Sequence, residues 1–258
     1  MSPTQTDTPS IKELWLVGIG TGSPAHVTLE GMQALREAAV ILVPDKGAGK
    51  EDLAAMRHSI LAASGTDAQV ISFDYPVRDA RLPYQERVEL WHDEIAARWQ
   101  AAMAGADRTG PVALLVWGDP SLYDSTLRIA ERLMPAPQLR VVPGLTAIQA
   151  LTAAHALPLN TINGAVTITT GRRLRDHSWP DGTETLVVML DANSEFQRMS
   201  ADTYIWWGAF LGMPEQVLAK GRIGEVAAQI VSLRESARAR HGWIMDSYLM
   251  RAPFVGKS

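Results

Sequence analysis

Short apolar runs alternate with helical stripes along the first half of the chain. The most distinctive run, residues 112–117 (VALLVW), carries no charge and lies between Gly110-Pro111 and Gly118-Asp119-Pro120. A continuous apolar run of this length predicts a strand that a parallel sheet buries on both faces. A helix is predicted from Ser121 onward. The turn between them should therefore present backbone amides at the carboxyl edge of the sheet, where small ligands bind in open α/β folds.

The same alternation predicts the other elements of this half. Strands are expected at residues 14–20, 39–43, 70–73 and 139–142. Helices are expected after an N-cap at Thr28, around residues 53–60 and over residues 83–104, where apolar residues recur at helical spacing. Strands and helices that alternate in this way predict a parallel α/β domain.

The second half is richer in strands. Apolar runs predict strands at residues 166–170, 185–190, 204–209 and 215–220, after a helix over residues 145–156. One late helix is predicted from an apolar stripe formed by Ile223, Val226, Ile230 and Leu233. Because few helices lie between these strands, a mixed sheet covered on one side is expected. The domain boundary is placed near Gly144, which gives an N-terminal domain of residues 11–144 and a C-terminal domain of residues 145–258.

Composition narrows the class of protein. The chain has 258 residues, of which 47% are hydrophobic and 20% charged, as expected of a globular protein, and we expect it in the cytoplasm. A net charge of −4 with scattered Lys and Arg predicts no nucleic-acid partner, and no apolar run is long enough to predict a membrane span. The absence of Cys excludes disulfides, thiolate metal sites and a Cys nucleophile. The His residues show no HxxxH or HxH spacing, so no metal site is expected.

A Gly-rich turn follows the first predicted strand. Residues 18–23, GIGTGS, nearly match the dinucleotide fingerprint GxGxxG, but Ser23 occupies the place of the third Gly. No acidic residue follows the next strand convincingly at the ribose-binding distance, and Asp45 is the nearest. The chain also lacks the P-loop and GxSxG motifs. A nicotinamide-binding site is therefore not favoured.

Five segments, in order along the chain, resemble the tetrapyrrole methylase family, which transfers methyl groups from S-adenosylmethionine. They are LVGIGTGSPAHVTLEGMQALREAAVIL, LLVWGDPSLYDST, VVPGLTAIQALTAAHALPL, TLVVML and GMPEQVLAKGRIGEVA. The resemblance implies an α/β fold of two domains, with an N-terminal parallel sheet, a C-terminal mixed sheet and the active cleft between them. It also implies a homodimer.

The resemblance further implies S-adenosylmethionine contacts at the positions that match the family's motifs. They are Thr21 in the opening Gly-rich turn, Trp117, Gly118, Asp119 and Leu122 in the GDP turn, Thr146 and Ala147 after Pro143-Gly144, Leu190 after its strand, and Leu211, placed to within a residue or two. Thr21 stands where the family usually has Pro, so a backbone contact that depends on Pro is not carried over to that turn.

Three segments narrow the resemblance to one branch of the family. They are GTGSP, PDKGAGKEDL and YPVRDARLPYQERVELWHDEI. They are similar to the branch that acts in aerobic cobalamin synthesis with loss of an acetyl group. The implied reaction methylates C-1 of precorrin-5 and releases the acetyl group as acetate, which gives precorrin-6A.

This reaction calls for two further kinds of residue. Removal of the acetyl group by water needs a proton acceptor, for which Asp45 and His92 are the candidates, although a buried structural role is an alternative for His92. A precorrin carries many carboxylates, so basic side chains after the strands should orient it. The candidates for this role are Lys46, Arg78, Arg172 and Arg173, with solvent-exposed loop charges as the alternative reading.

Two other functions stay open. One is a methylase of the same family that acts on another precorrin position or on a modified histidine side chain of a protein. The other is a nucleotide-binding module without catalysis, which the full set of motifs does not favour.

Overall fold

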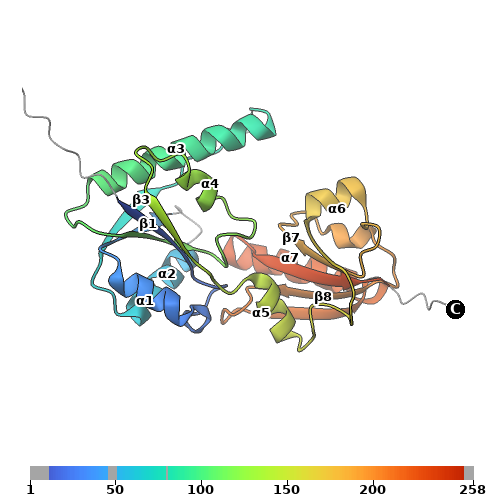
Figure 1. The fold of residues 1–258 in the computed structure, drawn as a ribbon. Helices are drawn as coiled ribbons and strands as arrows, with labels where there is room; N and C mark the ends of the chain where they lie inside the picture. The colour runs from blue at the N-terminus through green and yellow to red at the C-terminus, as the bar shows by residue number, and fades with distance from the viewer. Residues whose placement is uncertain (1–11, 46–50, 80, 253–258) are drawn as a thin grey trace, which may run out of the picture. The chain divides into compact units, whose positions relative to one another are not determined.

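The computed structural model describes residues 12–45, 51–79 and 81–252, and it divides into two compact units, Met1–Leu145 and Thr146–Ser258 (Figure 1). Each unit contains one five-stranded sheet. Lys46 and the side chain of Asp45 lie outside the described residues. The roles that the sequence predicts for these two residues therefore stay predictions.

The sheet of the first unit is parallel throughout. Its strands are β1 (Glu13–Gly18), β2 (Val40–Asp45), β3 (Gln69–Asp74), β4 (Val112–Val116) and β5 (Gln138–Val142). They lie in the order β3-β2-β4-β1-β5, so β4 is the central strand. Every residue of β4 is buried, as its continuous apolar run predicts. Because all pairs are parallel, the carboxyl ends of the strands lie at one edge of the sheet.

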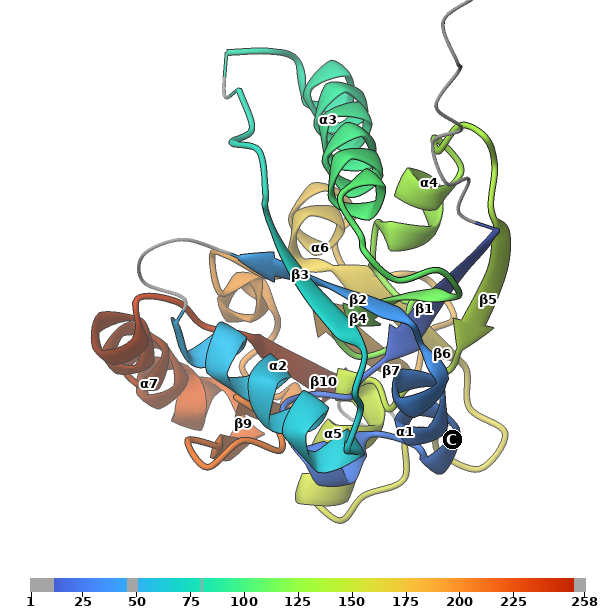
Figure 2. The same cartoon turned by 90° about the vertical axis from the view of Figure 1, so that its left-hand side faces the viewer.

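Helices cover both faces of this sheet (Figure 2). Leu14 and Leu16 pack with α3 (Tyr84–Ala104) and α4 (Thr126–Ala130). Trp15 and Val17 pack on the opposite face with α1 (Leu29–Glu37) and α2 (Glu51–Ser64). Successive residues of a strand point to opposite faces, so a strand that is apolar at every position is buried on both sides. The predicted parallel α/β architecture is confirmed.

The helix after the central strand begins later than predicted. Residues 121–125 form a turn, and α4 starts only at Thr126. Asp119 Oδ1 accepts a hydrogen bond from Ser121 N at 2.8 Å, and Asp124 Oδ1 accepts one from Thr126 N at 2.6 Å. Tyr123 has a φ of 50°, which a right-handed helix excludes. The predicted start at Ser121 is therefore wrong, because Asp side chains bind the amides that a continuous helix would use.

The sheet of the second unit is mixed, as predicted. Its strands are β6 (Val166–Thr170), β7 (Thr185–Met189), β8 (Tyr204–Ala209), β9 (Val217–Arg222) and β10 (Asp246–Arg251), in the order β6-β7-β10-β8-β9. β6 and β7 are parallel, whereas β10 is antiparallel to both of its neighbours. The other elements are α5 (Ala147–Ala154), α6 (Gly171–His177), the 3-10 turn η2 (Glu195–Arg198) and α7 (Ile223–His241).

Two elements of this unit escape sequence-based prediction. The middle strand, β10, has the charged residues Asp246 and Arg251 at its ends and so lacks a long apolar run. The short helix α6 begins directly after β6, where the sequence indicates a loop. Its N-cap is Thr170, whose hydroxyl accepts from the backbone N of Arg173 at 3.4 Å. β10 is held by pairing with β7 and β8, which are distant in the chain, whereas α6 depends on a short local cap.

The second sheet is also covered on both faces, not on one face as predicted. Gly208 of β8 faces Leu151 of α5, which would lie 3.0 Å from a Cβ on that Gly. Its neighbour Trp207 points to the opposite face, where Arg234 of α7 lies next to Asp246. A second covering helix explains why the strands are apolar at most positions. None of the described helices is both long enough and apolar enough to cross a membrane.

Candidate functional site

Three Gly-containing turns meet at the carboxyl edge of the first sheet. Gly20, after β1, and Gly118, after β4, form an isolated bridge in which Gly118 N donates to Gly20 O at 2.8 Å and Gly20 N donates to Gly118 O at 3.3 Å. Gly144 follows β5, and its N donates to Asp119 Oδ2 at 2.9 Å. We call Gly18, Gly20, Gly118, Asp119 and Gly144 the glycine cluster.

Close backbone contacts explain why this cluster needs Gly. A Cβ on Gly144 would lie 2.1 Å from Gly118 O, and a Cβ on Gly18 would lie 2.6 Å from Gly144 N. A side-chain rotation cannot relieve a clash between a Cβ and a backbone atom. Gly20 and Gly118 also have φ values of 74° and 65°, in the left-handed region that favours Gly. The three turns therefore present backbone amides and carbonyls at the edge of the sheet.

Asp119 has a structural role that the sequence does not indicate. Its Oδ1 accepts from the backbone N and the hydroxyl of Ser121, and its Oδ2 accepts from Gly144 N. Burial tends to raise the pKa of Asp119, but these hydrogen bonds stabilise the carboxylate and hold the pKa below its ordinary value. Both carboxylate oxygens are thus occupied in holding the GDP turn against the Pro143-Gly144 turn.

Trp117 and Leu122 flank the GDP turn. The guanidinium of the buried Arg57, from α2, lies 5.5 Å from the ring centre of Trp117. Burial lowers the pKa of Arg57, and the aromatic ring offsets part of the cost of removing its charge from water. Leu122 N donates to Asp119 O at 3.2 Å, which closes the turn. The Trp117 side chain therefore helps pack α2 against the sheet.

Thr21 contacts His26 in the opening turn. Thr21 Oγ1 and His26 Nδ1 are 3.0 Å apart. His26 ends the 3-10 turn η1 (Pro24–His26), and its Cβ would lie 2.5 Å from a Cβ built on Gly20. Both side chains are half-buried. At the position where the family usually has Pro, this chain therefore has a hydroxyl that hydrogen-bonds to an imidazole.

In the second unit, the predicted residues lie at the start of α5 and after two strands. Thr146 caps α5, its hydroxyl accepting from a backbone amide of the first turn at 3.1 Å, and Ala147 is the first helical residue. Leu190 follows β7 with a φ of 53° and a side chain that is 66% exposed. Leu211 is only 5% exposed and packs where Gly208 lacks a Cβ. Leu211 thus offers a ligand its backbone and not its side chain.

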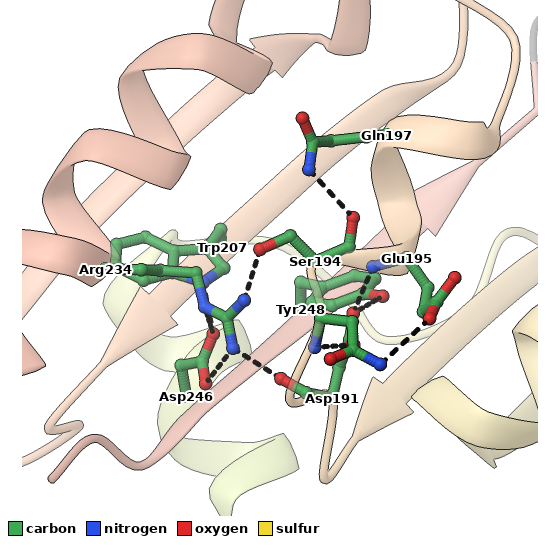
Figure 3. Close-up of polar contacts among 9 residues, drawn as sticks. Asp191, Ser194, Glu195, Gln197, Trp207, Arg234, Asp246 and Tyr248 are labelled. Carbon is green, nitrogen blue, oxygen red and sulfur yellow. Dashed lines mark hydrogen bonds and ion pairs between the residues drawn. The ribbon is translucent and has the colours of Figure 1, made fainter.

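A buried polar network holds the chain directly after Leu190 (Figure 3). Asp191 Oδ2 accepts from Glu195 N and from Tyr248 Oη, each at 2.7 Å. Arg234 of α7 donates to the backbone O of Asp191. Burial raises the pKa of Tyr248 well above its ordinary value, so the phenol stays protonated and donates to Asp191. These contacts determine the path of the turn that carries Leu190.

The same network contains a buried ion pair. Arg234 Nε and Asp246 Oδ2 are 2.9 Å apart, and the two side chains are 8% and 7% exposed. This Nε–H does not point along a hydrogen bond, so the contact is an ion pair, whereas Trp207 Nε1 donates to Asp246 Oδ2 at 2.8 Å. Burial raises the pKa of Asp246, and the attraction of Arg234 opposes that shift. α7 is thereby joined to β10 and to the turn after β7.

His92 lies on α3 and is 3% exposed. Neither of its ring nitrogens has a hydrogen-bond partner among the residues that the structure describes. Burial, with the positive charge of Arg132, lowers the pKa of His92 and keeps the imidazole neutral. Such packing favours the structural alternative for His92, and its role as a proton acceptor stays a prediction.

Arg78 follows β3 and is exposed. Its guanidinium lies 3.8 Å from the ring centre of Trp91, in a cation–π contact. The adjacent carboxylate of Asp79 pairs with Arg81 at 2.7 Å, not with Arg78. The positive charge of Arg78 is therefore held on an aromatic ring and is not cancelled by its acidic neighbour.

Arg172 and Arg173 lie in the first turn of α6 and are exposed. The sequence places them in a loop, and this placement is wrong because the Thr170 hydroxyl caps a helix there. The acidic Asp176 pairs with Arg175 at 2.9 Å and also interacts electrostatically with Arg172. Their proposed contact with a substrate stays a prediction.

Comparison with known proteins identifies the family. Residues 13–227 match the model of the Tetrapyrrole (Corrin/Porphyrin) Methylases. The chain belongs to this family. A relative from Sinorhizobium sp named precorrin-6A synthase (deacetylating) is 42% identical to this methylase over 252 residues, which cover 93% of this chain and 95% of the relative.

Solved structures agree with this assignment. A cobalamin synthesis related protein (CobF) from Corynebacterium diphtheriae has a TM-score of 0.78 and 41% identity to the methylase, covering 94% of this chain and 99% of its own. A uroporphyrin-III C-methyltransferase from Thermus thermophilus, solved in complex with S-adenosyl homocysteine, has a TM-score of 0.59 at 18% identity, covering 93% and 97% of the two chains. This second likeness shows the shared fold.

Several residues that shape the methylase's turns are missed by sequence reasoning. Arg234 and Asp246 read as an ordinary helix charge and a loop charge, and no spacing rule joins them. His26 stands at a variable position of the opening motif. The sequence signal for a contact between turns is clearest at Gly144, because a Gly at the end of a strand indicates close approach of two backbones.

Proposed function

We propose that this methylase uses S-adenosylmethionine to convert precorrin-5 into precorrin-6A, methylating C-1 and releasing the acetyl group as acetate. The observation that carries the proposal is the 42% identity, over nearly the full length of both chains, to a relative named precorrin-6A synthase (deacetylating). The segments GTGSP, PDKGAGKEDL and YPVRDARLPYQERVELWHDEI support the same reaction.

We assign the cofactor to the positions at which the chain matches the family's motifs, which include the glycine cluster. The residues that would hold it are Thr21, Trp117, Gly118, Asp119, Leu122, Thr146, Ala147, Leu190 and Leu211. S-adenosylmethionine has a cationic sulfonium and a zwitterionic tail, which backbone carbonyls and amides can bind. Gly18 and Gly144 let the turns after β1, β4 and β5 pack backbone against backbone, which gathers amides and carbonyls of the kind such a ligand needs at one edge of the sheet.

The protein's contribution to methyl transfer is mainly placement. Bound S-adenosylmethionine supplies an electrophilic methyl group. Residues of the site hold C-1 of the precorrin in contact with it and exclude water, and such placement can contribute roughly 7 to 11 kcal/mol. Deacetylation needs in addition one water molecule and a proton acceptor. We further propose that the enzyme is a homodimer in the cytoplasm and that a precorrin is its substrate.

Calorimetric titration with S-adenosyl homocysteine tests the cofactor assignment. Wild-type enzyme should bind it, and Asp119→Asn should weaken binding about tenfold or more. Asn has one carbonyl oxygen and cannot accept from both Ser121 and Gly144, so the two turns separate. No binding by the wild type at high micromolar ligand would contradict the methyltransferase function.

Asp124→Asn is the matched control for this titration. Asp124 Oδ1 accepts from the backbone N and the hydroxyl of Thr126, and an Asn carbonyl can replace it. Affinity should stay within about twofold of the wild type. Circular dichroism verifies that both variants are folded, and equal affinity in folded Asp119→Asn would exclude the GDP turn as the cofactor site.

Incubation with precorrin-5 and methyl-labelled S-adenosylmethionine tests the reaction itself. Acetate is assayed in the same samples, and one acetate should appear for each methyl group transferred. Methyl transfer without acetate would indicate another precorrin position. Cofactor binding without either product would indicate a different substrate.

Arg78→Gln and Arg172→Gln should each raise the KM for the precorrin about tenfold and flatten its dependence on salt. With a net charge of −4, the whole protein does not attract a polycarboxylate, so local positive charge must do so. Affinity for S-adenosyl homocysteine should not change. Arg222→Gln, which removes an exposed ion pair with Asp202 at 3.1 Å, is the control. Wild-type KM and salt response in both variants would exclude these residues as the docking site.

A further inference from the structure

The deacetylation step needs a proton acceptor, and its position is restricted by the chemistry. In the proposed reaction, a single carbon, C-1 of the precorrin, loses an acetyl group and gains a methyl group. The acceptor must therefore lie near the methyl donor, which the proposed function assigns to the glycine cluster. Titratable side chains on the turns at the carboxyl edge of the first sheet are the groups to consider.

Most of these groups are already engaged. Asp119 uses both carboxylate oxygens in the cluster, and Asp124 accepts from the first amide of α4 at 2.6 Å. Asp79 pairs with Arg81 at 2.7 Å. Burial, with the negative charge of Asp124, raises the pKa of Tyr75 to about 12, so this phenol stays protonated at neutral pH. None of these groups is suited to take a proton from water.

We infer that His26 is the proton acceptor for the deacetylation, an assignment that rests on the proposed function. His26 lies on the connection between β1 and α1, at the carboxyl edge of the sheet. Its Cβ packs against Gly20, and Gly20 pairs with Gly118 of the GDP turn. His26 is half-buried, whereas His92 is sealed in the core.

The contact with Thr21 prepares the imidazole for this role. When Nδ1–H donates to Thr21 Oγ1 across the 3.0 Å contact, the proton is on Nδ1 and Nε2 carries a lone pair. Nε2 has no hydrogen bond within the part of the chain that the structure describes, nor is His26 joined there to any ionised side chain. A Pro at position 21 has no hydroxyl to hydrogen-bond to the ring, so this orientation of His26 depends on Thr21.

The proposed step balances in atoms and electrons. Water oxygen bonds to the acetyl carbonyl carbon while one water proton passes to His26 Nε2. The bond between C-1 and the acyl carbon then breaks, its electron pair stays on C-1, and acetic acid leaves and ionises to acetate. The imidazolium returns its proton to solvent. C-1 is thereby left electron-rich at the place where the methyl group is added, so the base generates the nucleophile in position.

His26→Asn in the full-length enzyme is the direct test. The Asn amide can keep the contact with Thr21 but has no basic nitrogen. With precorrin-5 and methyl-labelled S-adenosylmethionine, acetate release should fall at least about 100-fold, and methyl transfer should fall with it. Affinity for S-adenosyl homocysteine should stay within about twofold. His58→Asn, on the exposed side of α2, is the control and should leave both rates unchanged.

The pH profile and chemical rescue separate a base from a structural residue. Acetate release by the wild type should fall as the pH is lowered, because a protonated imidazole cannot accept a proton. This acid limb should be absent from His26→Asn, and added imidazole should restore part of its rate. A residue that only shaped the turn would leave the acid limb in place and would not respond to imidazole.

Acetate release at the wild-type rate in His26→Asn would overturn the inference. So would a slower rate with an unchanged acid limb and no rescue. His26→Gln is made in parallel, so that misfolding of one variant still leaves a test, and binding of S-adenosyl homocysteine identifies the folded variants. If the wild type itself neither bound S-adenosyl homocysteine nor transferred methyl groups, the proposed function would fail, and this result is distinct from a failure of the His26 assignment.

Discussion

Gly144→Ala is expected to disrupt the glycine cluster and to abolish binding of S-adenosyl homocysteine. The new Cβ would lie 2.1 Å from Gly118 O and 2.8 Å from Gly18 Cα, and both are backbone atoms. Relief requires the turn after β5 to move away from β1 and β4, which also breaks the hydrogen bond from Gly144 N to Asp119. We expect the free energy of unfolding to fall by about 3 kcal/mol or more.

Urea unfolding and calorimetry measure the two effects separately. Gly105→Ala is the control, because a Cβ at the end of α3 would have its nearest neighbouring atom at 3.6 Å. That variant should change the free energy of unfolding by less than about 0.5 kcal/mol. Wild-type affinity for S-adenosyl homocysteine in Gly144→Ala would show that the cluster does not form the cofactor site.

Arg234→Met is expected to lower the free energy of unfolding by about 3 to 5 kcal/mol. Arg234 and Asp246 are 8% and 7% exposed, so removal of the guanidinium leaves the Asp246 carboxylate buried without its counter-ion. The variant also loses the donor to the backbone O of Asp191, in the turn that carries Leu190. Met fills a similar volume, so the loss reports on charge and hydrogen bonding more than on packing.

The pH dependence of this loss identifies its cause. Burial already raises the pKa of Asp246 in the folded state, so the folded protein binds this proton more tightly than the unfolded chain does. Stability from this group is present at low pH and is lost as the pH rises through the raised pKa. Without Arg234 the pKa should rise further. The deficit of Arg234→Met relative to the wild type should therefore shrink as the pH falls from neutral.

Two further variants complete this experiment. Asp246→Asn in the Arg234→Met background should restore part of the stability, because an Asn carbonyl still accepts from Trp207 Nε1 without a buried charge. Arg222→Met is the control, since it removes an ion pair whose side chains are 60% and 65% exposed and should cost less than about 1 kcal/mol. A deficit of Arg234→Met that is the same at every pH would mean that Asp246 is not charged in the folded protein.

The parallel sheet of the first unit could be predicted from the order of residues alone. β4 is apolar at all of its positions and buried at all of them, and alternate residues of β1 enter separate cores on the two faces. A strand that is buried on both sides is apolar at every position, so it does not show the mixed apolar and polar spacing of an amphipathic helix. The family motifs likewise located the turns after β1, β4 and β5, because a turn's Gly and Pro residues are local in sequence.

The contacts that join those turns were decided only by the tertiary structure. Asp119 accepts from Gly144 N, 25 positions away, and Gly20 pairs with Gly118, because a parallel sheet brings the ends of distant strands to one edge. No local pattern reports such a pairing. For the same reason, the sequence shows which polar groups a turn contains but not which distant residues bind them.

In the second unit, the contrast between what local sequence predicts and what distant contacts decide is larger. Its apolar strands were predictable by themselves, whereas β10 begins with Asp246, which reads as a loop residue. Its burial is favourable only because α7 places Arg234 beside it and β8 supplies the Trp207 N–H. The sequence by itself determined the apolar framework and the turn motifs of this protein, because burial and backbone geometry act locally. The tertiary structure decided which charges are buried and which side chains remain available for chemistry, since both depend on partners that are distant in the chain.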